Sequence, residues 1–379
     1  MAKKDKNLTV WEAACIITGF GIGAGVLSVP LMAQKNGILQ SALSFVAVYV
    51  VNYILHLMIA ELAMKTEGGQ IISCLSRFLF RGKAQKFTWI FFVLIVFVLF
   101  CNLATYLIAG AEVIVSLLGV SDFVAKLIFY VIAAAVVFFG LKIMGISEKI
   151  AVWIIFALLA VLGVASFCKP AHPMALFGGN LNQGLAFYGM AMFAISEFFS
   201  MPQVVEGLDR DKKKIKKAIR IGFLNAAIVM AVITYFTLRT SAEVTEVALV
   251  CWSEALGTWA QVIGGLVTIL AMLTTYWSIS LALGSIVGEQ THWNKNICWL
   301  VATLPSLLLT LFNIGTFMSI MRTAGGVISI IMAVMVIPAF HNARKDVPEI
   351  TLLERGGNGV QIVITLGYIL MGIGNVVPY

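Results

Sequence analysis

The chain has 379 residues, of which 60% are hydrophobic and only 12% are charged, and its mean hydropathy is +0.98. Because soluble domains carry about 25% charged residues, this composition excludes a water-soluble globular protein. The apolar stretches are continuous rather than alternating, as in 89–118, which excludes an outer-membrane β-barrel. We therefore expect an all-α integral membrane protein with short loops.

Eleven apolar segments follow in chain order, and a spanning helix needs about 20 such residues. An inside N-terminus places 21 Lys and Arg residues in the inner segments, 4 in the outer ones and one within a span. Because basic residues concentrate on the cytoplasmic side, we expect the N-terminus inside and the C-terminus outside. The net charge of +8 then serves topology and contact with anionic membrane lipid rather than nucleic-acid binding. The predicted spans lie at about 9–34, 38–64, 87–118, 122–141, 149–168, 184–208, 218–240, 258–288, 296–312, 316–340 and 360–377.

The first span is interrupted by glycines. Gly19, Gly21, Gly23 and Gly25 occupy every second position, and Pro30 follows. Each interior glycine weakens a helix by roughly 1 kcal/mol relative to alanine, and unwound backbone in a bilayer is tolerated only where protein or a cavity surrounds it. We therefore expect a broken helix whose amides and carbonyls face a ligand. Close helix packing on the glycines is the alternative.

The sixth span contains a second interruption, where Glu197 lies mid-span and Pro202 follows. Spans 1 and 6 correspond in a five-plus-five arrangement, and an odd number of helices per half gives the two halves opposite orientations. Paired breaks of this kind indicate a substrate site near the membrane midplane of an inverted-repeat transporter. We expect a first repeat in 1–168, an inverted second repeat in 180–340, and a cytoplasmic loop with one additional helix in 341–379.

Three short motifs resemble one transporter superfamily. The segment that begins at Gly19, GFGIGAGVLSVPLMAQKNG, resembles the first transmembrane segment of amino acid/auxin permeases and aromatic amino acid permeases. The F-x-x-x-E pattern at 193–197 and the A-x-x-T-T pattern at 271–275 are similar to segments of the same superfamily of amino acid, polyamine and organocation transporters. Its members share the fold of the bacterial leucine transporter. The resemblance therefore implies a secondary active amino acid transporter that works by alternating access.

The resemblance also implies a Na+ site between spans 1 and 8. The residues that it implicates are Gly19, Ile22 and Ala271 through their carbonyls, and Thr274 and Thr275 through their hydroxyls. The alternative is that these hydroxyls bond carbonyls of their own helix and permit tight packing. Span 5 has no mid-span Lys, the residue that replaces sodium in some proton-coupled relatives, and this favours Na+ over H+.

An amino acid substrate needs donors for its carboxylate and acceptors for its ammonium group. The start of a half-helix provides amide donors and a favourable dipole. Ionisable residues inside the membrane are costly and usually functional, so Glu197 is predicted to bind the substrate or carry a proton, with a protonated structural donor as the alternative. Tyr106 either caps the site or belongs to the core. The candidate substrate-binding residues are Gly21, Gly23, Ala24, Gly25, Phe193, Ala194, Ser196, Glu197 and Tyr106.

Charged residues near the span ends suggest gates. Glu112 lies about 9 Å inside the outer end of span 3 and Arg322 about 12 Å inside that of span 10, at 1.5 Å per residue. We expect them to pair as an outer gate, or Arg322 to bind the substrate carboxylate. Glu12 and Glu61, near inner ends, are expected to pair with basic inner loops.

Two loops are predicted to be structured. Residues 68–80 suit an amphipathic segment along the inner interface, and 243–257 suit a short outer helix with Trp252 and Trp259 at headgroup level.

The six cysteines are scattered without a metal-like pattern, which leaves open whether Cys168 and Cys251 pair.

The sequence and the resemblance together predict a Na+-coupled symporter of a neutral, aromatic or other hydrophobic amino acid in the bacterial cytoplasmic membrane. H+-coupled transport through Glu197 is one alternative, and an amino-acid receptor subunit that does not transport is another. No nucleophile–base pair or H-E-x-x-H motif is present in the sequence, so an enzyme is not expected. The identity of the amino acid, symport against exchange, and the oligomeric state are left open.

Overall fold

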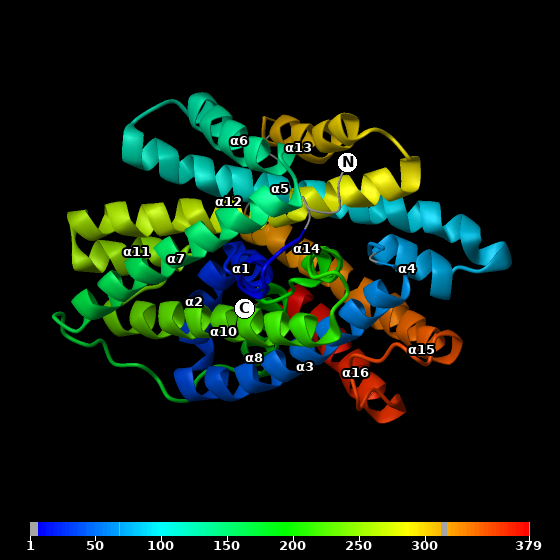
Figure 1. Ribbon diagram of the computed structural model, residues 1–379. Helices are drawn as coiled ribbons and strands as arrows, with labels where there is room; N and C mark the ends of the chain where they lie inside the picture. Colours follow the sequence, from blue (N-terminus) through cyan, green and yellow to red (C-terminus); the bar gives the residue numbers. More distant parts are fainter. Residues whose placement is uncertain (1–6, 68, 312–316, 379) are drawn as a thin grey trace.

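A computed structural model of the protein describes residues 7–67, 69–311 and 317–378, and within these ranges no β-strand occurs. Long helices run side by side across the molecule (Figure 1). In chain order they are α1 (Val10–Gly21), α2 (Ala24–Asn36), α3 (Ile38–Lys65), α4 (Ile71–Phe78), α5 (Phe87–Leu118), α6 (Asp122–Phe138), α7 (Leu141–Ser166), α8 (Leu181–Ala194), α9 (Met201–Gly207), α10 (Lys212–Thr240), α11 (Ala248–Leu256), α12 (Thr258–Thr291), α13 (Lys295–Thr310), α14 (Phe317–Ile331), α15 (Ile337–Asp346) and α16 (Asn358–Val376).

The helices match the predicted spans in order. In the described part of the chain, eight helical segments are long and apolar enough to cross a membrane, and the bent pair α1–α2 makes a ninth. Two of the eight are composite, α8 with α9 and α14 with α15. The shorter helices α6, with 17 residues, and α13, with 16, occupy the two remaining predicted positions. The expected all-α membrane architecture is therefore confirmed.

Spans 1 and 6 are both broken, as predicted. A capping box at Thr9 and Glu12 starts α1, because each side chain accepts from the backbone amide of the other. The helix ends at Gly21, and α2 continues from Ala24 at an angle of 50°. The break is shorter than the glycine pattern suggested. In span 6, α8 ends at Ala194, and a 3-10 turn at Phe198–Ser200 precedes α9.

The additional helix α16 packs against α8 and α14 (Figure 1). The contact with α8 brings backbone against backbone, because a Cβ atom on Gly189 would lie only 2.7 Å from the carbonyl carbon of Gly374. The hydroxyl of Tyr368 also donates to Asn52 Oδ1 of α3 at 2.6 Å. The last helix is thus bound to the first half of the broken span 6 and to span 2.

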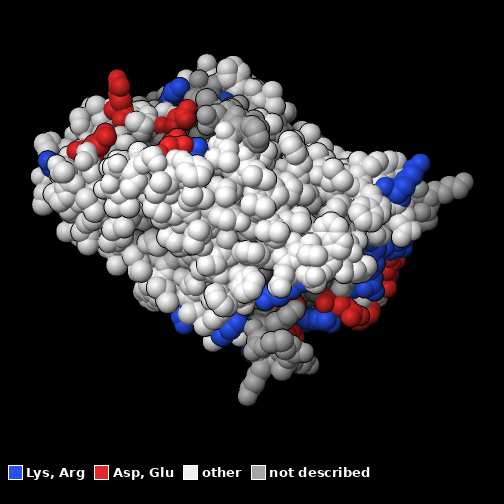
Figure 2. All heavy atoms as spheres, turned by 90° about the horizontal axis from the view of Figure 1, so that it is seen from above, with Lys and Arg blue, Asp and Glu red and all other residues white. Residues whose placement is uncertain are grey.

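Charged side chains leave a broad uncharged belt on the surface. Figure 2 shows charged side chains of both signs gathered at two opposite ends of the molecule, with an almost uncharged surface between them. Many large apolar side chains are exposed, among them Trp89, Trp153 and Leu366. Such a belt suits contact with lipid tails, where charged groups are costly.

Glu12 and Glu61 pair with basic residues, as expected. Glu12 accepts from Lys142 at 2.6 Å and lies 3.6 Å from Lys149 of the same helix α7. Glu61 accepts two hydrogen bonds from Arg344 at 2.9 and 3.0 Å. It is also 3.1 Å from Lys65 and accepts from the backbone amides of Leu352 and Leu353. These contacts connect α1 with α7, and α3 with α15 and the loop that follows α15.

The two short helices α4 and α11 correspond to the predicted loops, but one tryptophan assignment is wrong. Trp252 is fully buried and donates to Ser166 Oγ at 2.8 Å, because α11 packs against α10 and α12. Trp259 is half exposed, as a headgroup position requires.

Cys168 and Cys251, whose pairing the sequence left open, are both free thiols and form no disulfide with each other.

Candidate functional site

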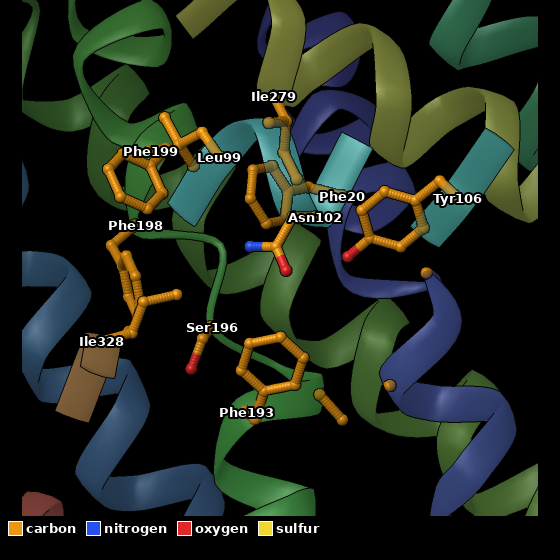
Figure 3. A pocket seen from close by; sticks show the side chains of 13 residues that line it. Phe20, Leu99, Asn102, Tyr106, Phe193, Ser196, Phe198, Phe199, Ile279 and Ile328 are labelled. Atoms are coloured by element: carbon orange, nitrogen blue, oxygen red, sulfur yellow. The ribbon is translucent and has the colours of Figure 1, made fainter. Parts of the chain in front are cut away.

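A narrow cavity of about 20 Å³, room for about one water molecule, lies where the two helix breaks face each other. Residues from α1, α2, α5, α8, α12 and α14 and from the loop after α8 surround it (Figure 3). It therefore brings together distant parts of the chain at the position expected for a substrate. The lining residues are Phe20, Gly23, Gly25, Leu99, Asn102, Tyr106, Phe193, Ala194, Ser196, Phe198, Phe199, Ile279 and Ile328.

The cavity wall is largely aromatic, with a few polar groups. The rings of Phe20, Phe193, Phe198 and Phe199 lie around the space, and Asn102 reaches toward its centre (Figure 3). Asn102 Oδ1 is buried without a hydrogen-bond partner. A buried polar atom without a partner is costly, so this oxygen is free to accept from a ligand.

The N-terminus of α2 opens onto the same cavity. Gly23 caps α2 without a side-chain hydrogen bond, and the first amides of a helix have no partner within that helix. Gly23 and Gly25 line the cavity, and Ala24 between them is buried. The amides and dipole at this end attract an anion such as a carboxylate. Gly21 is placed differently from the prediction, because it still belongs to α1 and does not line the cavity.

Glu197 lies in the break of span 6 but faces away from the cavity lining. Its Oε2 is 3.4 Å from His56 Nε2 of α3, and neither side chain is exposed. His56 Nδ1 is 2.6 Å from the carbonyl oxygen of Asn52. A carbonyl can only accept, so Nδ1 carries a hydrogen and Nε2 faces the carboxyl group. Glu197, predicted to bind the substrate or carry a proton, therefore does not line the cavity in this conformation.

The predicted Na+ residues of spans 1 and 8 meet. Thr274 Oγ1 donates to the Gly19 carbonyl at 3.0 Å, and Thr275 Oγ1 lies 3.2 Å from the same oxygen and 3.3 Å from that of Phe20. Both hydroxyls are also 3.0 Å from the Ala271 carbonyl. Ile22 follows in the break. Four of the five predicted residues thus bring oxygen atoms within hydrogen-bonding distance of one another.

One buried carboxyl group beside these residues was missed. Glu148 of α7 has no exposed surface, and its Oε1 accepts from Ser278 of α12 at 3.0 Å. Its Oε2 has no hydrogen-bond partner. The predicted span 5 begins only at 149, whereas α7 begins at Leu141, so Glu148 falls outside the span that hydropathy predicts.

The predicted outer gate pair is not formed in this conformation. Arg322 donates to the carbonyl of Gly374 at 3.0 Å and to that of Val377, both at the C-terminal end of α16. The last carbonyls of a helix lack partners within it and attract cations. Glu112 is exposed, and no ion pair joins it to Arg322 within the described residues.

Comparisons with known proteins agree with this architecture. Residues 6–375 match the tryptophan/tyrosine permease family. Glutamine transporter 2 of Aliivibrio fischeri is 22% identical over 345 residues, which cover 87% of this chain and 88% of that protein.

Two solved structures share the fold at 13% sequence identity. Mhp1, a nucleobase-cation-symport-1 family transporter in a closed conformation with bromovinylhydantoin bound, matches with a TM-score of 0.70 over 98% of this chain and 92% of its own. MhsT in complex with L-phenylalanine matches with a TM-score of 0.67 over 99% of each chain. The protein is a membrane transporter rather than an enzyme. It has the fold of the bacterial leucine transporter and belongs to the tryptophan/tyrosine permease family.

Proposed function

We propose that this protein is a secondary active transporter that carries a neutral, hydrophobic amino acid together with Na+. The observation that carries the proposal is the cavity between the two helix breaks, which combines a helix N-terminus with an aromatic wall. The two breaks are also the points at which half-helices can change angle, as alternating access requires.

The cavity lining supports an uncharged side chain on the substrate. None of the described lining residues is charged, so a charged substrate side chain would be buried without a partner, at high cost. The substrate carboxylate is assigned to the amides at Gly23, Ala24 and Gly25. The ammonium group is assigned to acceptors at Phe193, Ala194 and Ser196 and to Asn102 Oδ1, with Tyr106 at the side of the cavity. MhsT, a fold neighbour, was solved with L-phenylalanine, which is consistent with an aromatic substrate.

The oxygen atoms at Gly19, Ala271, Thr274 and Thr275 support Na+ as the coupled ion, with Ile22 as a further ligand. Na+ is a hard cation, and hard cations prefer oxygen ligands such as carbonyls and hydroxyls. In this assignment Na+ is carried with the amino acid and is not a permanent component of the protein. The two threonine hydroxyls already face these carbonyls, so little rearrangement separates the present hydrogen bonds from a cation site.

The orientation proposed is an inside N-terminus and an outside C-terminus in a bacterial cytoplasmic membrane. The distribution of basic residues along the sequence supports it, because this orientation places 21 Lys and Arg residues in the inner segments and 4 in the outer ones.

Uptake into sealed proteoliposomes tests the proposal. With an inward Na+ gradient, we expect a hydrophobic amino acid to accumulate above its external concentration, and no accumulation when choline replaces Na+. A thermal-shift screen of the twenty amino acids, with Na+ and with choline, selects the substrate to be labelled. Binding without accumulation would instead identify a receptor.

Coupling to H+ is a second candidate, and the contact between Glu197 and His56 supports it. An acid and a base that face each other in a fully buried site can hold one proton between them. Under this candidate a proton gradient alone drives uptake, and Glu197→Gln abolishes gradient-driven accumulation but leaves substrate exchange intact. Under Na+ coupling, a proton gradient without Na+ drives no accumulation.

A further inference from the structure

A buried carboxyl group adjoins the candidate Na+ site without an ion-pair partner. Glu148 has no exposed surface, and its Oε2 accepts no hydrogen bond. Taking an ionised carboxylate out of water costs several kcal/mol unless a cation or hydrogen bonds compensate. The position of this oxygen therefore requires an explanation beyond packing.

The unpartnered oxygen lies directly against Gly19. An alanine at position 19 would collide with Glu148 Oε2, and its Cβ would also lie 3.0 Å from Thr274 Cβ. The Gly19 carbonyl is the oxygen that faces the hydroxyls of Thr274 and Thr275. Glu148 from α7 and the two threonines from α12 thus approach the same residue of α1.

Ser278 holds the carboxyl group in this orientation. It lies about one helical turn after Thr274 on α12 and donates to Glu148 Oε1 at 3.0 Å. The Ser278 carbonyl in turn accepts from Gln203 Nε2 of α9 at 3.0 Å. One carboxylate oxygen is therefore satisfied, and the other is left beside Gly19.

The described basic side chains do not neutralise this carboxyl group. The two lysines of α7, Lys142 and Lys149, both pair with Glu12. Within the residues that the structure describes, no Lys, Arg or His lies within ion-pair distance of Glu148. A bound cation or a proton therefore has to balance the charge of Glu148.

We propose that Glu148 supplies an anionic oxygen to the Na+ site at Gly19, Ala271, Thr274 and Thr275. The inference rests on the proposed Na+-coupled function and extends it. Neutral carbonyls and hydroxyls alone would leave the charge of the ion uncompensated in the interior, whereas a carboxylate makes the occupied site neutral. Gly19 is then required because any side chain there would separate the carboxylate from the other oxygens.

Binding of ²²Na+ to the purified full-length protein tests this role independently of transport. Glu148→Gln removes the charge but keeps an amide oxygen that can accept from Ser278. We expect its Kd for Na+ to rise by roughly tenfold to a hundredfold, as when a partner of a metal site is lost. Glu148→Asp, which keeps the charge on a shorter side chain, and Ser278→Ala, which removes only the orienting hydrogen bond, should each raise the Kd less.

Glu289→Gln is the matched control. This glutamate is on α12, the helix of Ser278, and is partly buried, but it accepts from the backbone amide of Gln70 and from Ser73, on the side of α4. Its Kd for Na+ should equal that of the wild type. Thermal unfolding in choline checks that each variant is folded. If Glu148→Gln does not fold, the Kd of Glu148→Asp for Na+ tests the proposal in its place.

The outcomes separate the two proposals. If the wild type binds no Na+, the proposed Na+ coupling is wrong. If the wild type binds Na+ and the charge-neutral variant has the same Kd, the coupling stands and the role of Glu148 is wrong. If Glu148→Gln does not fold and Glu148→Asp does, an unchanged Kd for Na+ in Glu148→Asp also shows that the proposed role of Glu148 is wrong.

Discussion

Glu197 Oε1 lies against the Cα of Gly21, where any Cβ atom would collide with it. Gly19 has the same relationship with Glu148, and residues two apart on a helix point to nearly opposite sides. Gly23 in turn makes room for Thr275, whose Oγ1 would lie 2.5 Å from a Cβ atom there. The alternate glycines therefore accommodate two buried carboxyl groups and a hydroxyl. Only part of their pattern belongs to the unwound segment.

The first prediction concerns Gly21→Ala. Alanine normally stabilises a helix interior by about 1 kcal/mol relative to glycine, but here its methyl group would collide with Glu197 and lie 3.0 Å from Ala226 Cβ. We expect a net loss of about 1–3 kcal/mol, the usual cost of overpacking, seen as a lower thermal midpoint in detergent. Gly326→Ala of α14 is the control, because a Cβ atom there meets nothing within 4 Å. If the thermal midpoint of Gly21→Ala equals or exceeds that of the wild type, as expected for the control, the Glu197 carboxyl group moves aside freely.

The second prediction is that Thr274→Ala combined with Thr275→Ala abolishes the Na+ dependence of binding and transport. The double variant removes two of the oxygens that face the Gly19 and Ala271 carbonyls. Thr268→Ala is the matched control on the same helix, because its hydroxyl bonds the Gly264 carbonyl at 2.9 Å. Amino acid binding measured at a series of Na+ concentrations checks the result. Unchanged Na+ dependence in the double variant would remove Na+ from this site and favour H+.

The third prediction concerns Asn102, whose Oδ1 is buried without a partner at the cavity. Asn102→Leu should weaken amino acid binding by about 1–3 kcal/mol, the cost of leaving a buried polar group of the substrate unsatisfied. That cost corresponds to a rise in Kd of roughly 5-fold to 150-fold. Competition binding against a labelled amino acid measures it.

Thr105→Ala provides the control for Asn102. Thr105 is equally buried on α5, but its hydroxyl bonds the Cys101 carbonyl of its own helix at 3.0 Å. Its affinity should match the wild type. A full-affinity Asn102→Leu variant would show that the side chain does not contact the substrate.

The fourth prediction concerns Arg322 and Glu112. Because Arg322 binds carbonyls at the end of α16, Arg322→Ala should lower the thermal midpoint and slow turnover, and Glu112→Ala should change neither. Affinity, turnover and unfolding are measured for both variants and for the charge swap. A swap that restores turnover would support the predicted gate pair in another conformation, whereas loss of binding in Arg322→Ala alone would make Arg322 a substrate ligand.

The spans and both breaks could be predicted because hydropathy, glycine and proline act locally. The sequence also identified Glu197, but not the side on which it lies, since its contact with His56 depends on how α3 packs against the break. Glu148 was missed because a carboxylate next to Lys149 resembles the charged end of a span. It is buried only because α7 starts earlier and packs on α1 and α12.

The residues of the cavity wall could not all be predicted from the sequence either. Four of them belong to apolar runs in which many positions have the same character, namely Leu99 and Asn102 of α5, Ile279 of α12 and Ile328 of α14. Which of them face the cavity is decided by tertiary packing, and a single sequence does not encode that choice locally. Asn102 was the one position in this set with a readable signal, a polar side chain at helical spacing from Tyr106.

The close approach of Gly189 and Gly374 has a practical consequence. Backbone lies against backbone there, and Asn375 Nδ2 of α16 lies 3.4 Å from the Gly189 carbonyl of α8, so no side chain separates the two helices at this point. We expect them to move as one rigid body. A spin label or fluorophore on the exposed Val376, which does not line the cavity, would then report the angle of the half-helix during the transport cycle.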